Sequence, residues 1–172
     1  MITEERLVAL EQRLQAAEDV LAIQNLMTRY LNTADGGWDR VSHDGTRVAP
    51  LFVEDGVWEA EHVAKAVGRR EIAALWDGFR QSTPFAFHTI ANPLIEVSGN
   101  QAVGEWHLLA LVTGRLAMGP LRSEATELLS AAIYTNHFVR TESGWLFKSI
   151  FVRPAFFEPF AKGWAEARHL AR

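Results

Sequence analysis

The feature that most constrains the fold is a change of hydrophobic pattern near Pro84, where helical spacing gives way to long strand-forming runs. Residues 85–97 and 101–113 are both rich in β-branched, aromatic and aliphatic side chains. The residues between them, Ser98-Gly99-Asn100, are typical of a turn. The pattern therefore predicts a long β-hairpin.

A second hairpin is predicted over residues 126–141 and 145–153, joined across Glu142-Ser143-Gly144. Residues 114–124, which contain a Gly-Pro pair, are expected to form the loop between the two hairpins. Residues 154–172 are expected to form an aromatic tail, because two prolines and a glycine interrupt any regular element there.

The first half of the chain is predicted to be mainly helical. Apolar residues recur at helical spacing over residues 7–31, and Gly36-Gly37 is expected to end that helix. Residues 51–58 indicate the end of a short helix, a turn at Asp55-Gly56 and the start of a strand, with a second strand to follow. Residues 70–80 again show helical spacing.

Three helices followed by long antiparallel strands predict an α+β fold in one domain spanning residues 1–172. In such a fold the helices pack on one face of the sheet, and where the sheet curls it leaves a pocket. Because fold does not determine function, the side chains facing that pocket must indicate the chemistry.

Composition excludes several kinds of partner and cofactor. The net charge of -4 gives no positive field to hold nucleic acid or an anionic membrane surface, so a hydrophobic small molecule is the expected partner. The absence of cysteine rules out disulfides, thiolate nucleophiles and cysteine-ligated metals. A charged N-terminus and the lack of a long apolar run favour the cytoplasm.

No sequence motif for a metal or cofactor is present. Apart from His88, which is considered below, the histidines show no zinc-binding spacing: His43, His62, His107, His137 and His169. The sequence also has no nucleophile elbow, phosphate-binding loop or dinucleotide fingerprint. We therefore expect no metal and no cofactor. Strand alternation places His107 on the opposite face from Trp106.

Three residues are the best candidates for catalysis: Tyr30, Asp35 and His88. A histidine oriented by a carboxylate is a general base near neutral pH, and a nearby phenol can donate a proton. The alternatives are a core histidine, a turn aspartate and a buried core tyrosine. Asp35, however, follows a helix end whose dipole disfavours a carboxylate by roughly 0.3–1 kcal/mol, which favours a cationic partner such as protonated His88.

The chain resembles the SnoaL-like family of the nuclear transport factor 2-like superfamily. The resemblance covers nearly the whole chain and rests on motifs that occur in the family's order. These are Ala22-Ile23-Gln24-Asn25-Leu26 leading to Tyr30 and Asp35, then His88 and Pro93, Gly104-Glu105-Trp106, Tyr134-Thr135-Asn136 and Gly144-Trp145.

The resemblance implies a fold and specific residue roles. The fold is a cone-shaped, curved, mixed β-sheet that packs against three N-terminal helices and encloses a hydrophobic pocket. The catalytic aspartate and histidine of bile-acid 7α-dehydratase and hexachlorocyclohexane dehydrochlorinase fall on Asp35 and His88, and the dehydratase tyrosine falls on Tyr30. Ala110 stands where the dehydratase has a further aspartate, which argues against a steroid substrate, and Arg153 matches a dehydratase arginine and is a candidate anion contact. The substrate-binding residues implied are Trp106, Ala110, Tyr134 and Arg153.

The predicted function is a cofactor-independent lyase or isomerase acting on a hydrophobic cyclic molecule. His88 would be the base, Asp35 its orienting partner and Tyr30 the acid. The alternative is a non-catalytic binding or accessory subunit, like the β subunits of ring-hydroxylating dioxygenases. A homo-oligomer is expected, a trimer or a dimer by resemblance, because the first helix carries an apolar stripe that needs a partner: Leu7, Leu10, Leu14, Ala17 and Leu21.

Overall fold

The structure is a computed structural model, and it describes residues 3–114 and 126–160. Its helices are α1 (Glu4–Ala34), α2 (Gly45–Val48), the 3-10 helix η1 (Ala49–Leu51) and α3 (Arg69–Ser82). Its strands are β1 (Phe52–Ala60), β2 (Ala64–Val67), β3 (Phe85–Ser98), β4 (Gln101–Gly114), β5 (Thr126–Thr141) and β6 (Gly144–Pro159).

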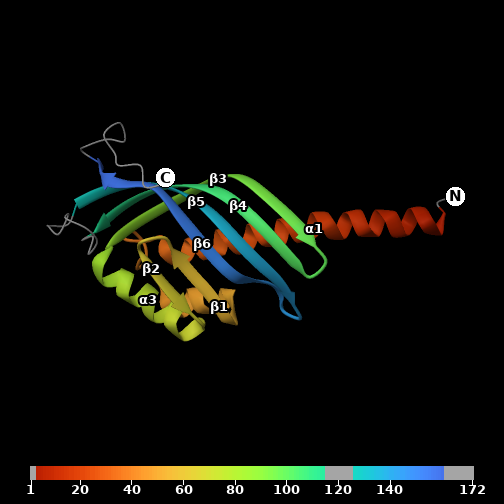
Figure 1. The fold of residues 1–172 in the computed structure, drawn as a ribbon, viewed down its shortest axis with the longest axis horizontal. Helices are drawn as coiled ribbons and strands as arrows, with labels where there is room; N and C mark the ends of the chain where they lie inside the picture. Colours follow the sequence, from red (N-terminus) through yellow and green to blue (C-terminus); the bar gives the residue numbers. More distant parts are fainter. Residues whose placement is uncertain (1–2, 115–125, 161–172) are drawn as a thin grey trace.

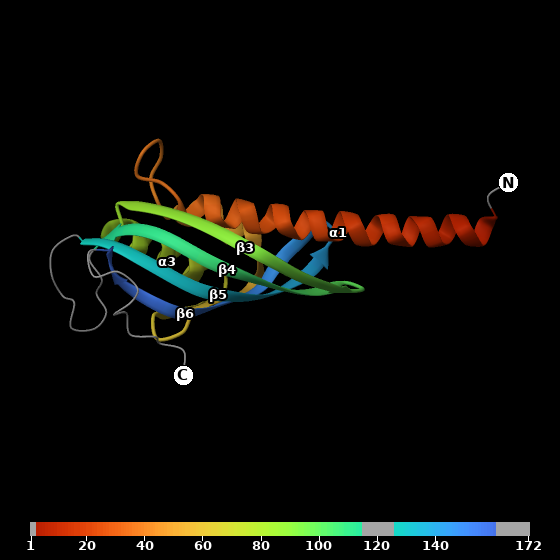
Figure 2. The same cartoon turned by 90° about the horizontal axis from the view of Figure 1, so that it is seen from above.

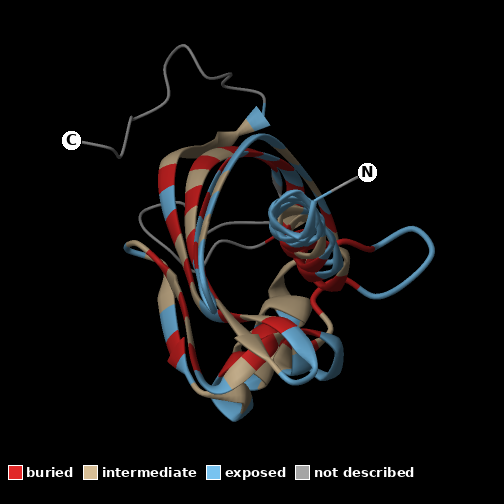
Figure 3. Cartoon of the chain, turned by 90° about the vertical axis from the view of Figure 1, so that its right-hand side faces the viewer, coloured by how far each residue is buried: buried red, intermediate tan, exposed pale blue. Residues whose placement is uncertain are grey.

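The strands form one curved, mixed sheet in the order β2-β1-β6-β5-β4-β3 (Figure 1). β1 runs parallel to β6, and the other neighbours pair antiparallel. Helices α1 and α3 lie on the concave side of the sheet, and buried positions recur along its strands (Figure 3). The predicted α+β class and the curved mixed sheet are confirmed.

Helix α1 is the longest element, and only its C-terminal half packs on the sheet. The Thr3 hydroxyl caps its N-terminus by accepting from the N–H of Arg6. From there the helix projects beyond the sheet (Figure 2), and its first buried residue is Asp19. The projecting half therefore leaves large apolar side chains in solvent: Leu7, Val8, Leu10 and Leu14.

Asp19 anchors α1 to the β5–β6 hairpin. Its carboxylate accepts hydrogen bonds from Arg140 Nη2, Trp145 Nε1 (3.1 Å) and Gln15 Nε2 (3.1 Å). The Arg140 guanidinium also lies 4.6 Å from the centre of the Trp145 ring. The hydrogen bond from Arg140 is the largest cause that lowers the pKa of Asp19 below its usual value. The carboxylate is therefore charged and fully paired at neutral pH.

We expect Asp19→Asn to lower the free energy of unfolding by about 2 kcal/mol, because it removes the charge that Arg140 and Trp145 share. Urea denaturation followed by circular dichroism measures this change. Glu18→Gln is the matched control, since Glu18 precedes Asp19 on the same helix and is exposed. Equal unfolding free energies for the two variants would show that the anchor is dispensable.

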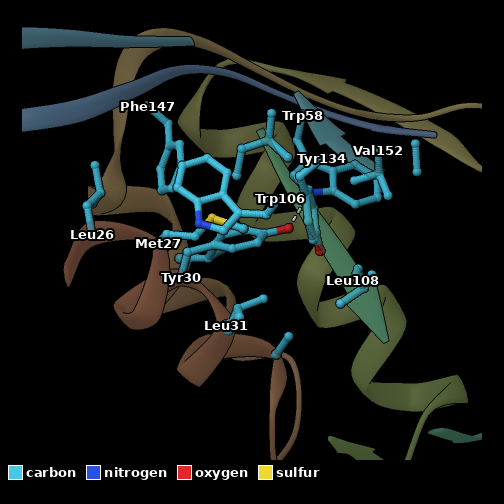
Figure 4. Close-up of a cluster of buried hydrophobic side chains, with 14 of the residues drawn as sticks. Leu26, Met27, Tyr30, Leu31, Trp58, Trp106, Leu108, Tyr134, Phe147 and Val152 are labelled. Atoms are coloured by element: carbon cyan, nitrogen blue, oxygen red, sulfur yellow. Dashed lines mark hydrogen bonds between the residues drawn. The ribbon is translucent and has the colours of Figure 1, made fainter. Parts of the chain in front are cut away.

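The core lies between α1, α3 and the concave face of the sheet. Along β4 the buried and exposed residues alternate, so that Trp106, Leu108 and Ala110 point inward. Tyr30 of α1 packs against the rings of Phe52, Trp76, Tyr134 and Phe147, with ring centres 5.5–6.4 Å apart (Figure 4). This aromatic cluster joins the helices to the sheet.

Two predictions of local structure were wrong. Asp55-Gly56 is not a turn but lies inside β1, where an irregular register between Phe52 and Val57 accommodates it. The last strand does not stop at Arg153 but continues through Pro159. Proline can be part of that strand because a register shift lies beside Pro154, which pairs with Ala132.

The structure agrees to within a few residues with the first hairpin, the first strand of the second hairpin, the long first helix and the helix before Pro84. The predicted loop over residues 114–124 and the end of the aromatic tail fall almost entirely on residues 115–125 and 161–172, which lie outside the described residues.

Candidate active site

The end of α1 and the start of β3 are tied together by backbone hydrogen bonds. Asp35 caps α1, and its N–H donates to the carbonyl of Leu31 (3.0 Å). The next residue, Gly36, exchanges two hydrogen bonds with Ala86, each of 3.0 Å. This bridge places Asp35 beside His88, which follows Ala86 by two residues on the same face of β3.

Asp35 and His88 form a close, largely buried pair. Asp35 Oδ1 accepts from the backbone N–H of His88 (2.9 Å) and lies 2.7 Å from His88 Nδ1. The side chains are 10% and 13% exposed. Because an ionised carboxylate can only accept, Nδ1 carries the proton and Nε2 is left with its lone pair. The pair therefore has the arrangement of a carboxylate-oriented general base.

A row of small side chains continues from His88 across the concave face. His88 pairs with Ala110, and Ala110 pairs with Ser130 on the next strand. Ala110 and Ser130 are both buried. Paired residues on neighbouring strands point to the same side of a sheet, so all three face the helices. The methyl group of Ala110 is therefore the side chain next to the base.

Tyr30 and Tyr134 lie on the same interior side. The Tyr30 hydroxyl accepts from Trp58 Nε1 (2.7 Å), and the rings of Tyr30 and Tyr134 meet edge to face at 6.2 Å (Figure 4). Burial raises the pKa of Tyr30 well above its usual value and also raises the pKa of Tyr134, to which the negative charge of Asp35 adds. Both phenols therefore keep their protons at neutral pH.

Trp106 also faces the interior, and a glycine makes its position possible. A Cβ added at Gly104 would lie 2.4 Å from the Trp106 indole, so no larger residue fits there. The ring packs edge to face with Phe138 at 6.0 Å and is buried. The packing of the Trp106 ring over Gly104 thus explains why the Gly104-Glu105-Trp106 motif has glycine at its first position.

Arg153 is not brought to the site. It is exposed and alternates along β6 with Val152 and Pro154, which are buried on the concave side. The predicted role of Arg153 as an anion contact for the same site does not fit this position. His107 is likewise exposed and lies within 3.2 Å of Asn92 on the outer face, as alternation predicted.

His43 is a residue that the sequence analysis set aside and the structure places at the site. Its ring lies 6.5 Å from the ring of His88 and is buried. It comes from the segment between α1 and α2, where no periodic pattern indicates which way a side chain points. Spacing therefore gave no signal for it.

Two surface hollows, of about 470 and 560 Å³, lie away from the Asp35–His88 pair. The first is lined by residues including Asp55, His137 and Lys148, and the second lies between α1 and Arg140. Within residues 3–114 and 126–160, no three histidine, aspartate or glutamate side chains gather closely enough to hold a metal ion. The chemically active groups described for this site are the acid–base side chains Asp35, His88 and Tyr30.

The model of the SnoaL-like domain matches residues 15–150. The chain belongs to the SnoaL-like family. This family is part of the nuclear transport factor 2-like superfamily, so the resemblance inferred from the motifs is confirmed. The match spans both members of the Asp35–His88 pair.

Solved structures share the fold of this SnoaL-like protein. Hexachlorocyclohexane dehydrochlorinase from Novosphingobium barchaimii is 24% identical, with 86% of this chain and 93% of that chain covered and a TM-score of 0.70. A scytalone dehydratase-like protein from Novosphingobium aromaticivorans is 20% identical, with 91% and 96% covered and a TM-score of 0.71.

A nuclear transport factor 2-like protein with a cystatin-like fold, also from Novosphingobium aromaticivorans, is 26% identical, with 90% of this chain and 91% of that chain covered and a TM-score of 0.62. No curated protein matches the chain. Among the helices of the described residues, none has the length and apolarity needed to cross a membrane.

Proposed function

We propose that this SnoaL-like protein is a cofactor-independent lyase or isomerase that removes a proton from carbon in a hydrophobic cyclic molecule. The observation that carries the proposal is the buried Asp35–His88 pair, with the Nδ1 of His88 held by the carboxylate at 2.7 Å. Positioned proton transfer of this kind typically contributes about 10²–10⁴-fold to a rate.

The roles of the pair follow from its hydrogen bonds. His88 Nε2 accepts the proton, and the carboxylate of Asp35 keeps the imidazole in the productive tautomer and stabilises the imidazolium that forms. The electron pair left on carbon forms a double bond as the leaving group departs, or moves onto a neighbouring carbonyl oxygen. The first outcome is elimination and the second begins an isomerisation.

The interior favours an uncharged, hydrophobic substrate. The side chains on the concave face around His88 are apolar or neutral, namely Ala86, Ile90, Leu108, Ala110 and Ser130. The carboxylate of Asp35 is already engaged by His88, so no unpaired charge is offered to an ionic ligand. The names of two structural neighbours, a dehydrochlorinase and a dehydratase, both describe eliminations and support the same chemistry.

A second candidate function is a non-catalytic binding or accessory subunit. The observation that favours it is the dense packing of Tyr30, which is 2% exposed and has its hydroxyl engaged by Trp58. These contacts are also what a purely structural core tyrosine would make. In this role the interior beside His88 would bind a hydrophobic molecule without turnover.

The test is a screen with cyclic substrates that can lose a proton and a leaving group, including hexachlorocyclohexane and scytalone. Chloride release and absorbance of the new double bond report turnover, with and without added chelator. Turnover that disappears in His88→Ala supports the lyase. Tight binding without turnover, equal in wild type and His88→Ala, would favour the accessory role.

Tyr30→Phe is expected to reduce kcat less than His88→Ala does, because Tyr30 would assist the departing group and is not the base. The variant should also lose about 1–2 kcal/mol of stability, since Trp58 Nε1 would be buried without an acceptor. Steady-state kinetics and urea denaturation measure the two effects. Unchanged kcat with reduced stability would assign Tyr30 to the core alone.

We also propose that the protein is a homo-oligomer. The outer face of the β3–β4 hairpin exposes the large apolar side chains of Phe87, Leu94, Leu109 and Leu111. The projecting half of α1 exposes those of Leu7, Leu10 and Leu14. Apolar patches of this kind usually mark protein contacts. Light scattering should give a mass two or three times 19.3 kDa.

The paired variants Leu14→Glu on α1 and Leu109→Glu on β4 locate the contact. The substitution at the true interface should lower the mass, and the other should not. A mass near 19.3 kDa for the wild type at micromolar concentration would show a monomer.

A further inference from the structure

The backbone of His43 is held in an uncommon conformation. Its φ is 50°, in the left-handed region that costs a residue other than glycine roughly 1–2 kcal/mol. Its N–H donates to the carbonyl of Ala34 (3.1 Å), and its carbonyl accepts from Arg80 Nε (3.1 Å). Because hydrogen bonds hold the backbone of the residue on both sides, the direction of its Cα–Cβ bond is fixed.

That direction brings the His43 ring against the base. The ring is 6.5 Å from the His88 ring at an interplanar angle of 79°, and it also contacts the rings of Trp76 (5.9 Å) and Phe79 (5.6 Å). The residue is 8% exposed. A second imidazole thus borders the Asp35–His88 pair from the α3 side.

One polar atom of this ring is left without a partner by the fold. His43 Nδ1 is fully buried and has no hydrogen-bond partner in the described part of the chain. An unpaired buried polar atom costs about 1–3 kcal/mol, which a phenylalanine or leucine of similar size would avoid. Because a buried N–H without an acceptor is rarer than a buried acceptor without a donor, we assign the proton to Nε2.

The His43 ring is also uncharged at neutral pH. Burial lowers the pKa of His43 to about 3, and the positive charges of His88 and Arg80 add to the effect. A neutral imidazole offers one N–H donor and does not repel the imidazolium that forms on His88.

We propose that His43 is a further catalytic residue, whose Nε2–H donates a hydrogen bond to the substrate atom on which negative charge develops as His88 removes the proton. This inference rests on the proposed function. The C–H bond breaks and its proton goes to His88 Nε2, while the electron pair forms the double bond and expels the leaving group or moves onto a carbonyl oxygen. His43 keeps its proton throughout.

The ligand class follows from this geometry. The substrate would carry a halogen, hydroxyl or carbonyl oxygen next to the carbon that loses its proton, so that the two imidazoles contact adjacent positions. A preorganised donor at such a site is worth about 10²–10³-fold in kcat. A purely structural His43 would contribute nothing of that kind.

Nuclear magnetic resonance of isotope-labelled histidine tests the proposal on the intact protein. The probe is para-nitrophenol, whose phenolate oxygen imitates the charge that develops on a substrate. We expect His43 to carry its proton on Nε2, and the ring signals of both His43 and His88 to shift as the probe binds. A shift of His88 alone, or a His43 proton on Nδ1, would overturn the role of His43. A probe that moves neither ring would overturn the proposed function as well.

Variants of His43 give a second readout. His43→Phe keeps the ring volume but not the donor, so the Kd of the probe should rise about tenfold. His43→Gln carries an amide N–H donor at about the reach of the imidazole Nε2, so its Kd should stay within about threefold of wild type. The matched control is His62→Phe, because His62 also has a left-handed φ of 62° but is exposed. Equal Kd values for His43→Phe and His62→Phe would show that His43 is structural.

Discussion

Replacing His88 by alanine is expected to lower kcat by about 10²–10⁴-fold while the fold remains intact. The reason is that His88 Nε2 is the proposed proton acceptor, and no other imidazole in the described residues is held by a carboxylate at 2.7 Å. Steady-state kinetics on the substrate found by screening measure the loss, and circular dichroism reports the fold. His107→Ala is the matched control, because His107 lies on the adjacent strand but faces outward.

Asp35→Asn should give a loss of similar order by a different route. The amide oxygen can still accept from the backbone N–H of His88, so the loop geometry is retained, but the negative charge that stabilises the imidazolium is removed. Both hydrogen bonds from His88 end on the same oxygen of Asp35. An amide turned the other way would put its nitrogen beside Nδ1, which would place the ring proton on Nε2 and block the base, and would lose the bond from the backbone N–H. Wild-type rates in either variant would contradict the proposed dyad.

Local pattern was sufficient for the long elements. The helix over residues 7–31 and both hairpins could be predicted because each has one periodicity and ends at glycine or a turn sequence. Asp35 could be placed at the end of α1 for the same reason. Its contact with His88, 53 residues away, depends on the bridge between Gly36 and Ala86 and cannot be obtained from periodicity.

The position of Arg153 shows where periodicity fails. Trp145 and Phe147 face inward, so an uninterrupted strand would also place Arg153 on the inner face. The register of β5 and β6 shifts between the pair Phe138–Phe147 and the pair His137–Ser149. After this irregularity the side chains that face inward are those of Ile150 and Val152. Arg153 therefore faces outward, and no residue type in the sequence marks the bulge.

His43 could not be identified from the sequence for a related reason. It lies outside the periodic segments, and its direction is set by contacts to α1 and α3 together with a left-handed φ. Histidine reaches that conformation more readily than most residues, but it leaves no sequence signal. Because the ring of His43 is buried, the residue is expected to have a measurable effect on stability.

Acid is expected to destabilise the wild type more than His43→Phe. The pKa of His43 is about 3 in the folded protein and about 6.5 in an unfolded chain, because burial and the nearby charges of His88 and Arg80 disfavour its protonation. Between those two pH values the unfolded chain binds a proton that the folded protein does not. The free energy of unfolding must therefore fall as pH decreases through that window, and the contribution of His43 levels off below about pH 3.

Urea denaturation at pH 7 and pH 4.5 measures this effect as a difference between variants, because the other ionisable groups contribute nearly equally to each. The wild type should lose about 2.5 kcal/mol more than His43→Phe over that interval, since each of the two pH units below the unfolded pKa removes up to about 1.4 kcal/mol. His62→Phe should behave as the wild type, because the side chain of His62 is exposed and not buried as that of His43 is. Equal losses of unfolding free energy in all three proteins would show that His43 takes up its proton in the folded state. A protonated His43 would be a cation beside His88, and it could not be the neutral donor that we propose.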